Sequence, residues 1–164
     1  MISFIRIDDR IIHGQIVIRW STEYPCDGII AVDDKSATNE VLRSALKSAT
    51  GGIRTLVYTR EQFLEKMAEA VGSEKNYFVI TKGPSAMAEL LVDHGMKTET
   101  KMLNVGPQSA RQGTYHVNRN AEITKEEMRD YERMHDLGYK ISFQLVPDNP
   151  KVEWKDVREK LLAM

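Results

Sequence analysis

Short apolar segments alternate with helical segments along most of this chain, and this alternation restricts the fold more than any other feature. Six segments have the length and composition of strands: Ser3–Ile7, Gly28–Val32, Arg54–Tyr58, Asn76–Thr81, Lys101–Val105 and Tyr139–Val146. Parallel strands need crossover connections, and the helical segments between them supply right-handed ones. The order predicts a three-layer α/β/α fold, with helices on both faces of an open, mainly parallel, doubly wound sheet of six to seven strands.

The helices are predicted from apolar spacing and from residues that begin or end helices. They cover about Ile11–Tyr24, Asn39–Ala49, a segment from Thr59 to Gly72, Gly83–Asp93, a segment from Thr124 to Leu137, and a last helix capped by Asn149-Pro150. Thr59 with Gln62, and Thr124 with Glu127, form capping boxes. Residues 106–122 depart from the alternation of strands and helices, which predicts a functional loop or a small antiparallel excursion.

The composition excludes several classes of protein. A length of 164 residues suits one domain over residues 1–164, and no apolar run approaches the roughly 20 residues that span a bilayer. The N-terminus lacks the regions of a signal peptide, so we expect a cytoplasmic location. A net charge of −1 without a basic block argues against broad nucleic-acid binding. No histidine pair has metal-ligand spacing and no Cys-x-x-Cys occurs, so we expect no metal and no cofactor.

The densest group of chemically active side chains follows the first predicted strand: Arg6, Asp8, Asp9, Arg10 and His13. A histidine can accept a phosphoryl group when one ring nitrogen attacks and the other is oriented by a hydrogen bond, which Asp8 or Asp9 can receive. Arg10, together with Arg6, would stabilise the charge of that group. The same residue types also fit a plain helix start, with an aspartate as N-cap and His13 as a surface group. The residues alone leave both interpretations open.

A longer pattern around these residues is specific. The segment Arg6-Ile7-Asp8-Asp9-Arg10-Ile11-Ile12-His13-Gly14-Gln15 resembles the N-terminal signature of the mannose/fructose/sorbose family of IIB components of the sugar phosphotransferase system. The resemblance continues in Ile30 to Asp34, in Leu103 to Gly106, and in Arg111 to Gly113 followed by Val117-Asn118. It therefore covers essentially the whole chain.

The resemblance implies a phosphoryl carrier. His13 would accept a phosphoryl group on Nδ1 from a phosphorylated IIA partner and pass it to a sugar that enters through the membrane components IIC and IID. The chain would associate peripherally with that permease during transfer. Asp8, Asp9 and Arg10 look like the residues around the phosphohistidine, and further phosphate-binding or cleft residues are Arg6, Gly14, Gln15, Asp33, Asp34, Asn104 and Gly106. The sugar remains open, and a homo-oligomer is compatible with the sequence.

Three other interpretations are weighed against this one. A receiver-like signalling domain needs an acceptor aspartate after the third strand, where this chain has Tyr58-Thr59-Arg60. A cysteine-phosphorylated IIB component would need Cys26 in an anion-binding loop, but Cys26 follows the first predicted helix. A non-enzymatic small-molecule or anion-binding module would use the same cleft without depending on His13.

One position departs from the family pattern, and the remaining histidines have weaker contexts. Gly106 is followed by Pro107-Gln108-Ser109 where family members often carry a second glycine, and Pro107 lacks a backbone donor. That loop's contacts, and its influence on sugar preference, are therefore left open. Structural roles are expected for His94, His116 and His135.

Overall fold

The computed structural model describes residues 1–164. The strands are β1 (Ile2–Ile7), β2 (Gly28–Val32), β3 (Arg54–Tyr58), β4 (Tyr77–Thr81), β5 (Met102–Val105), β6 (Thr114–Asn118), β7 (Ala121–Thr124), β8 (Lys140–Phe143) and β9 (Val152–Glu153). The helices are α1 (Gly14–Trp20), α2 (Asp34–Thr38), α3 (Glu40–Ser48), α4 (Arg60–Gly72), α5 (Pro84–Ala88), a π-helical turn η1 (Glu89–Asp93), α6 (Lys125–Asp136) and α7 (Trp154–Ala163). None of the helices combines the length and the apolar character needed to span a membrane.

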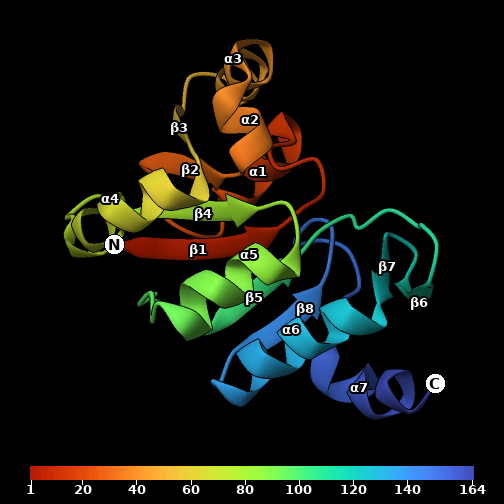
Figure 1. Cartoon of the computed structure of the whole chain (residues 1–164). Coiled ribbons are helices and arrows are strands. Elements are labelled where there is room, and N and C mark those ends of the chain that lie inside the picture. The colour runs from red at the N-terminus through yellow and green to blue at the C-terminus, as the bar shows by residue number, and fades with distance from the viewer.

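The main sheet has seven strands in the order β3-β2-β4-β1-β5-β8-β9 (Figure 1). All neighbouring pairs are parallel except β8 and β9. The connection after β1 leads through α1 towards β2 on one side, whereas the chain after β5 continues towards β8 on the other. The strand order therefore reverses between β1 and β5. In doubly wound sheets this reversal opens a crevice at the carboxyl ends of the strands.

Helices cover both faces of the sheet, as predicted, because strand side chains alternate between the two faces. Phe4 of β1 packs with α1 and α2 in a core of 11 buried residues that includes Val17 and Trp20. Ile5 and Ile7 of the same strand point to the opposite face, where a core of 25 buried residues joins α4, α5, α6 and α7. Figure 1 shows α1, α2 and α3 gathered on one side of the sheet and α5 and α6 on the other. The helix that follows the first strand thus belongs to the smaller core.

The predicted strands agree with the observed ones except at their ends, and both predicted capping boxes are present. Thr59 caps α4 and Thr124 caps α6, each with reciprocal hydrogen bonds to the residue three positions on. The uncertain region 106–122 contains the predicted antiparallel excursion, in which β6 pairs with β7. Helix α2 was not predicted; it begins because the Asp33 carboxylate accepts a hydrogen bond from Ser36 N.

The predicted bounds of the first and last helices are wrong. The first helix ends at Trp20 rather than near Tyr24. The first helix begins at Gly14 rather than Ile11, because Ile11 has a φ of 62° and His13 is extended. The last helix does not begin at Asn149-Pro150, because the chain first forms β9 and α7 starts only at Trp154. The Trp154 side chain is fully buried and its Nε1 donates to Glu132 Oε1 at 2.9 Å. This tertiary packing outweighs the local signal of the proline.

Candidate functional site

Two loops meet at the crevice between β1 and β5. Gly106 N donates to Ile7 O at 2.7 Å, and Asp9 N donates to Pro107 O at 3.0 Å. The Asp9 carboxylate accepts hydrogen bonds from both the backbone N and the Oγ of Ser109, at 2.7 and 2.5 Å. These contacts fasten the loop after β5 to the β1–α1 loop, which carries most of the predicted site residues.

A buried polar network lies beneath the β1–α1 loop. Arg6 and Asp8 are each 1% exposed, and the Arg6 Nη2 donates to Asp8 Oδ2 at 3.0 Å. The Arg6 Nη1 donates to Asn104 Oδ1, and Asn104 Nδ2 donates to Gln144 O at 2.9 Å. Burial lowers the pKa of Arg6 and the Asp8 carboxylate opposes that shift, while a guanidinium remains cationic at neutral pH. The network therefore buries a matched pair of charges.

Gly106 makes room for this network. A Cβ atom built at Gly106 would overlap the Arg6 guanidinium and lie 3.1 Å from Asp8 Oδ2. Any larger residue would force the buried ion pair to move, so a glycine is needed here for packing. Gly14 has a similar role at the start of α1, because its Cβ would overlap the backbone oxygen of Ala49 at the end of α3.

The network also shapes the loop that leads to His13. Asp8 Oδ1 accepts from Arg10 N at 2.9 Å, and Ile11 N donates to Asp8 O at 2.8 Å. Ile11 has a left-handed φ of 62°, which is strained for a β-branched residue. The strain is held in place because the side chains of Ile11 and Ile12 are buried in the smaller core.

His13 stands at the end of this loop as the N-cap residue of α1. Its carbonyl accepts the first hydrogen bond of the helix from Val17 N at 3.0 Å, while its imidazole is partly exposed and makes no hydrogen bond. Arg10 and Gln15 are exposed, and the Arg10 guanidinium has no carboxylate partner. The N–H groups of residues 14–16 precede the helical hydrogen-bond ladder. A nucleophilic ring, a free cation and backbone donors are therefore available to an anion at this end of β1.

The predicted role of a carboxylate in orienting the imidazole is not seen in the contacts. Asp8 is engaged by Arg6 and by Arg10 N, and Asp9 is engaged by Ser109. Through these hydrogen bonds, both carboxylates hold the β1–α1 loop in place instead.

The predicted residues after β2 serve as helix caps. Asp33 Oδ2 accepts from Ser36 N at 3.0 Å and from Ser36 Oγ at 2.7 Å. Asp34 Oδ1 accepts from Arg60 N at 2.7 Å, which ties α2 to the start of α4. Strand β4 separates β2 from β1, so these carboxylates belong to a more distant part of the same sheet edge.

A cavity of about 280 Å³ beside the β1–α1 loop was not predicted from the sequence. Its lining residues are Asp9, Lys82, Gly83, Gln108, Ser109, Arg111 and Glu127. Arg111 pairs with Glu127 and donates to Ser109 O at 3.0 Å, and the hydrogen bond to Glu127 raises its pKa. Glu127 was visible in the sequence only as part of a capping box. The link from Ser109 to Asp9 joins residues far apart in the chain and leaves no local signal.

Cys26 and the other histidines are poorer candidates for a nucleophile than His13. Burial raises the pKa of the Cys26 thiol to about 11, and its Sγ donates to Gly28 O at 3.5 Å. Cys26 is therefore a poor nucleophile at neutral pH. His94 lies 3.5 Å from Glu89 Oε1 and His116 lies 4.0 Å from Glu122 Oε2, both outside the loop described above. No three His, Cys, Asp or Glu side chains gather as a metal-binding group.

Comparison with known proteins assigns the chain to a family. The family model of the PTS system sorbose subfamily IIB component matches residues 2–163. The chain belongs to this family. Family membership makes it a IIB module of the sugar phosphotransferase system, and the resemblance seen in its sequence is confirmed.

Relatives of this IIB chain are named for different sugars. It is 26% identical to the mannose-specific EIIAB component of Escherichia coli K12 over 98% of its own length but only 49% of the relative's, so it spans about half of that protein. It is 26% identical to the fructose-specific EIIB component of Bacillus subtilis, over 93% and 92% of the two chains. The IIBSor domain of the Klebsiella pneumoniae sorbose permease has the same fold, with a TM-score of 0.86 at 24% identity over 98% and 97% of the chains.

Proposed function

We propose that this IIB component carries a phosphoryl group on His13, which it receives from a phosphorylated IIA protein and passes to a sugar. The observation that carries the proposal is the setting of His13. Its imidazole is partly exposed and free of hydrogen bonds, and it ends a loop that buried contacts of Asp8 hold in one conformation. Positioning of this kind lowers the entropic cost of bringing two reacting groups together.

The reaction divides into two transfers. In the first, a lone pair of a His13 ring nitrogen attacks the phosphorus of the donor phosphohistidine, a new N–P bond forms, and the donor N–P bond breaks with its electron pair returning to the donor imidazole. In the second, a sugar hydroxyl attacks the same phosphorus, the His13 N–P bond breaks, and the hydroxyl proton passes to a base. The family resemblance favours Nδ1 as the ring nitrogen.

Arg10 is the residue that we expect to assist both transfers. The transferring group carries negative charge on its oxygens, and a nearby guanidinium stabilises that charge in the transition state. Arg10 is exposed and unpaired, whereas Arg6 is committed to Asp8 and Asn104. Gly14, Gln15 and the backbone donors at the start of α1 complete the proposed phosphate-binding surface.

The proposed partners are those of the sugar phosphotransferase system to which the family belongs. A IIA donor is supported by the Escherichia coli relative, which is named an EIIAB component and of which this chain matches about half. Transfer to an imported sugar requires membrane components, for which we propose IIC and IID, with this chain acting at the cytoplasmic face. The sugar is not assigned, because the relatives are named for mannose, fructose and sorbose.

The test is phosphorylation by a reconstituted donor chain. Purified protein is incubated with phosphoenolpyruvate, enzyme I, the phosphocarrier protein and candidate IIA proteins, and its intact mass is then measured at neutral pH. The wild type and a His116→Ala control should each gain one acid-labile phosphate, and His13→Ala should gain none. His116 is a suitable control because its side chain is 69% exposed and lies on β6.

Two results would contradict the proposal in different ways. Equal labelling of His13→Ala would show that another residue accepts the phosphate. If a IIA protein that phosphorylates a known relative left the wild type unlabelled, a non-enzymatic anion-binding module would become the better account. The second result leaves the fold and the family assignment intact.

A further inference from the structure

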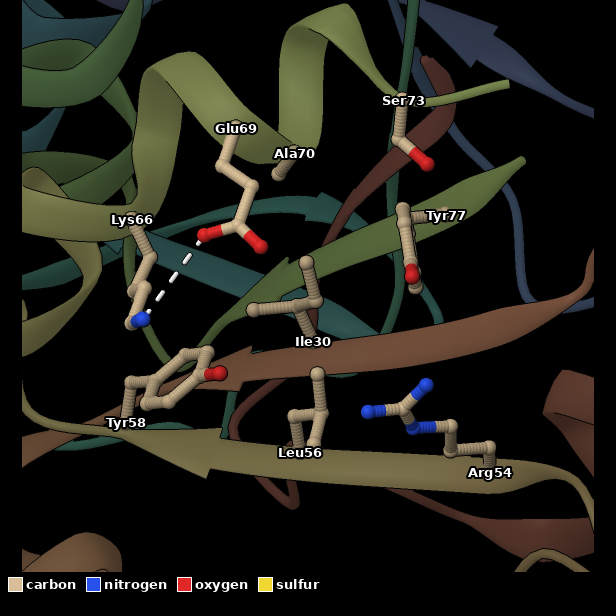
Figure 2. Close-up of a pocket in the computed structure, with 9 residues that line it drawn as sticks. All are labelled: Ile30, Arg54, Leu56, Tyr58, Lys66, Glu69, Ala70, Ser73 and Tyr77. Carbon is tan, nitrogen blue, oxygen red and sulfur yellow. Dashed lines mark ion pairs between the residues drawn. The ribbon is translucent and has the colours of Figure 1, made fainter. Parts of the chain in front are cut away.

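A pocket of about 260 Å³ lies under α4 at the edge of the sheet (Figure 2). Ile30, Leu56 and Ala70 line its floor and one wall, and Leu56 is the most exposed of the three. Arg54 and Tyr77 are the first residues of β3 and β4, so the pocket reaches the amino ends of the strands. His13 follows the carboxyl end of β1. It therefore lies at the opposite end of the parallel strands from the pocket. The phosphoryl-transfer proposal makes no use of this pocket.

The sheet itself creates the pocket. Gly28 pairs with Arg54 on one side and with Tyr77 on the other, so these three residues form one row across β3, β2 and β4. Because Gly28 has no side chain, the Tyr77 ring lies over it; a Cβ there would be 2.9 Å from Tyr77 Cε1. The next row on this face holds Leu56 and Ile30, which pair directly. The depression is therefore built into the strands and does not depend on a mobile loop.

Three polar groups face this apolar floor without partners. The Arg54 guanidinium has no hydrogen bond or ion pair, and neither do the hydroxyls of Tyr58 and Tyr77. In Figure 2 the Arg54 guanidinium and the Tyr58 hydroxyl lie on either side of Leu56, and the Tyr77 ring stands beside Ile30. The Tyr58 ring is held by stacking on the buried Phe63, at 6.4 Å between ring centroids. Lys66, by contrast, is paired with Glu69 at 3.7 Å, which leaves Arg54 as the free cation of the pocket.

We propose that this pocket binds a small carboxylic acid with an apolar, ring-sized body. The Arg54 guanidinium would donate two parallel hydrogen bonds to the carboxylate. The apolar body would lie against Leu56 and the rings of Tyr58 and Tyr77. The tyrosine hydroxyls would fix its orientation. A phosphorylated ligand fits less well, because the Glu69 carboxylate at the rim repels a dianion and only one cation is free.

The test is a nuclear magnetic resonance titration of ¹⁵N-labelled protein with phenylacetate. We expect saturable amide shifts at residues 54–58, 28–30 and 77, and no shifts in the loop before His13. Benzyl alcohol, which lacks the carboxylate, should bind at least about tenfold more weakly, because a hydrogen bond to a charged group is lost. Glucose 6-phosphate tests the alternative of a sugar-phosphate ligand.

Variants separate the proposed contact from general charge. Arg54→Gln should weaken phenylacetate binding about tenfold or more, and Arg54→Lys should fall between the two because it keeps the charge but loses the planar fork. Arg129→Gln, which removes an exposed arginine on α6, should leave binding unchanged. Each variant's amide spectrum reports whether it is folded.

Four outcomes would overturn the proposal. They are no saturable shifts at millimolar phenylacetate, shifts that map elsewhere, equal binding of benzyl alcohol, and equal binding by Arg54→Gln. Tighter binding of glucose 6-phosphate at the same residues would replace the carboxylic acid with a sugar phosphate as the ligand class. None of these results bears on phosphorylation of His13.

Discussion

Two groups of polar side chains, one beneath the β1–α1 loop and one on its outer surface, differ in every polar contact although most of them lie between Arg6 and Gln15. The inner group, Arg6, Asp8 and Asn104, is at least 95% buried and joined by hydrogen bonds. The outer group, Arg10, His13 and Gln15, is partly or fully exposed, and its side chains make no hydrogen bonds. The inner group can therefore fix the backbone, while the outer group is free for the phosphoryl transfer that we propose.

The buried ion pair should give the largest difference in stability. Arg6→Met leaves the Asp8 carboxylate buried without its cation, which should lower the free energy of unfolding by about 3–5 kcal/mol. Arg10→Met, the matched change in the outer group, should alter it by less than about 0.5 kcal/mol. Urea unfolding followed by circular dichroism measures both. Equal losses for the two variants would show that the inner group has no special structural role.

Gly106→Ala tests the inner group without removing any charge. The new methyl group would overlap the Arg6 guanidinium, and overpacking of this kind should reduce the free energy of unfolding by about 1–3 kcal/mol. Gly72→Ala is the control, because Gly72 is the last residue of α4, a Cβ there meets nothing within 4 Å, and its φ is not left-handed. The same urea titration applies. A loss no greater than that of the control would contradict the close packing at Gly106.

Trp20→Phe tests a hydrogen bond at the border of the inner group. Trp20 Nε1 donates to Leu145 O at 3.0 Å, and Arg6 Nη1 donates to the same oxygen at 3.3 Å. The variant should lose about 1 kcal/mol of stability, because one partly buried hydrogen bond is removed while the aromatic packing with Phe4 largely remains. Thermal unfolding measures the loss. An unchanged midpoint would place the Leu145 carbonyl outside the network.

His13→Gln should have the smallest effect on stability. The imidazole has no hydrogen bond to lose, so the free energy of unfolding should change by less than about 0.5 kcal/mol. Phosphate uptake from phosphorylated IIA should nevertheless be abolished, because glutamine is not a nucleophile for this transfer. Parallel unfolding and labelling experiments on the same preparation separate the two effects. A large stability loss would mean that His13 has a structural role that its contacts do not indicate.

The contrast also explains what could be predicted from the sequence. Strands such as Gly28–Val32 and the capping boxes at Thr59 and Thr124 are local, so residue order alone located them. The segment from Arg6 to His13 stood out because its charged residues are close together in the chain. The sequence did not show which of them are buried, because the buried Arg6 donates a hydrogen bond to Asn104, a partner nearly a hundred residues away.

Two further features depended on tertiary structure. The left-handed conformation of Ile11 moved the start of the first helix, and a β-branched residue gives no sign of such a conformation in a sequence. Pairing of β9 with β8 moved the start of the last helix beyond Pro150. In both cases tertiary packing outweighed the local residue pattern that predicted the helix start.

The most direct test of the central claim is to locate the phosphate in the phosphorylated wild-type chain. Trypsin releases the peptide from Ile11 to Arg19, Ile-Ile-His-Gly-Gln-Ile-Val-Ile-Arg, in which histidine is the only residue able to carry a phosphoryl group. After labelling through IIA and digestion at neutral pH, mass spectrometry should find the phosphate on this peptide alone. Phosphate on any other peptide, with this one unmodified, would contradict His13 as the acceptor.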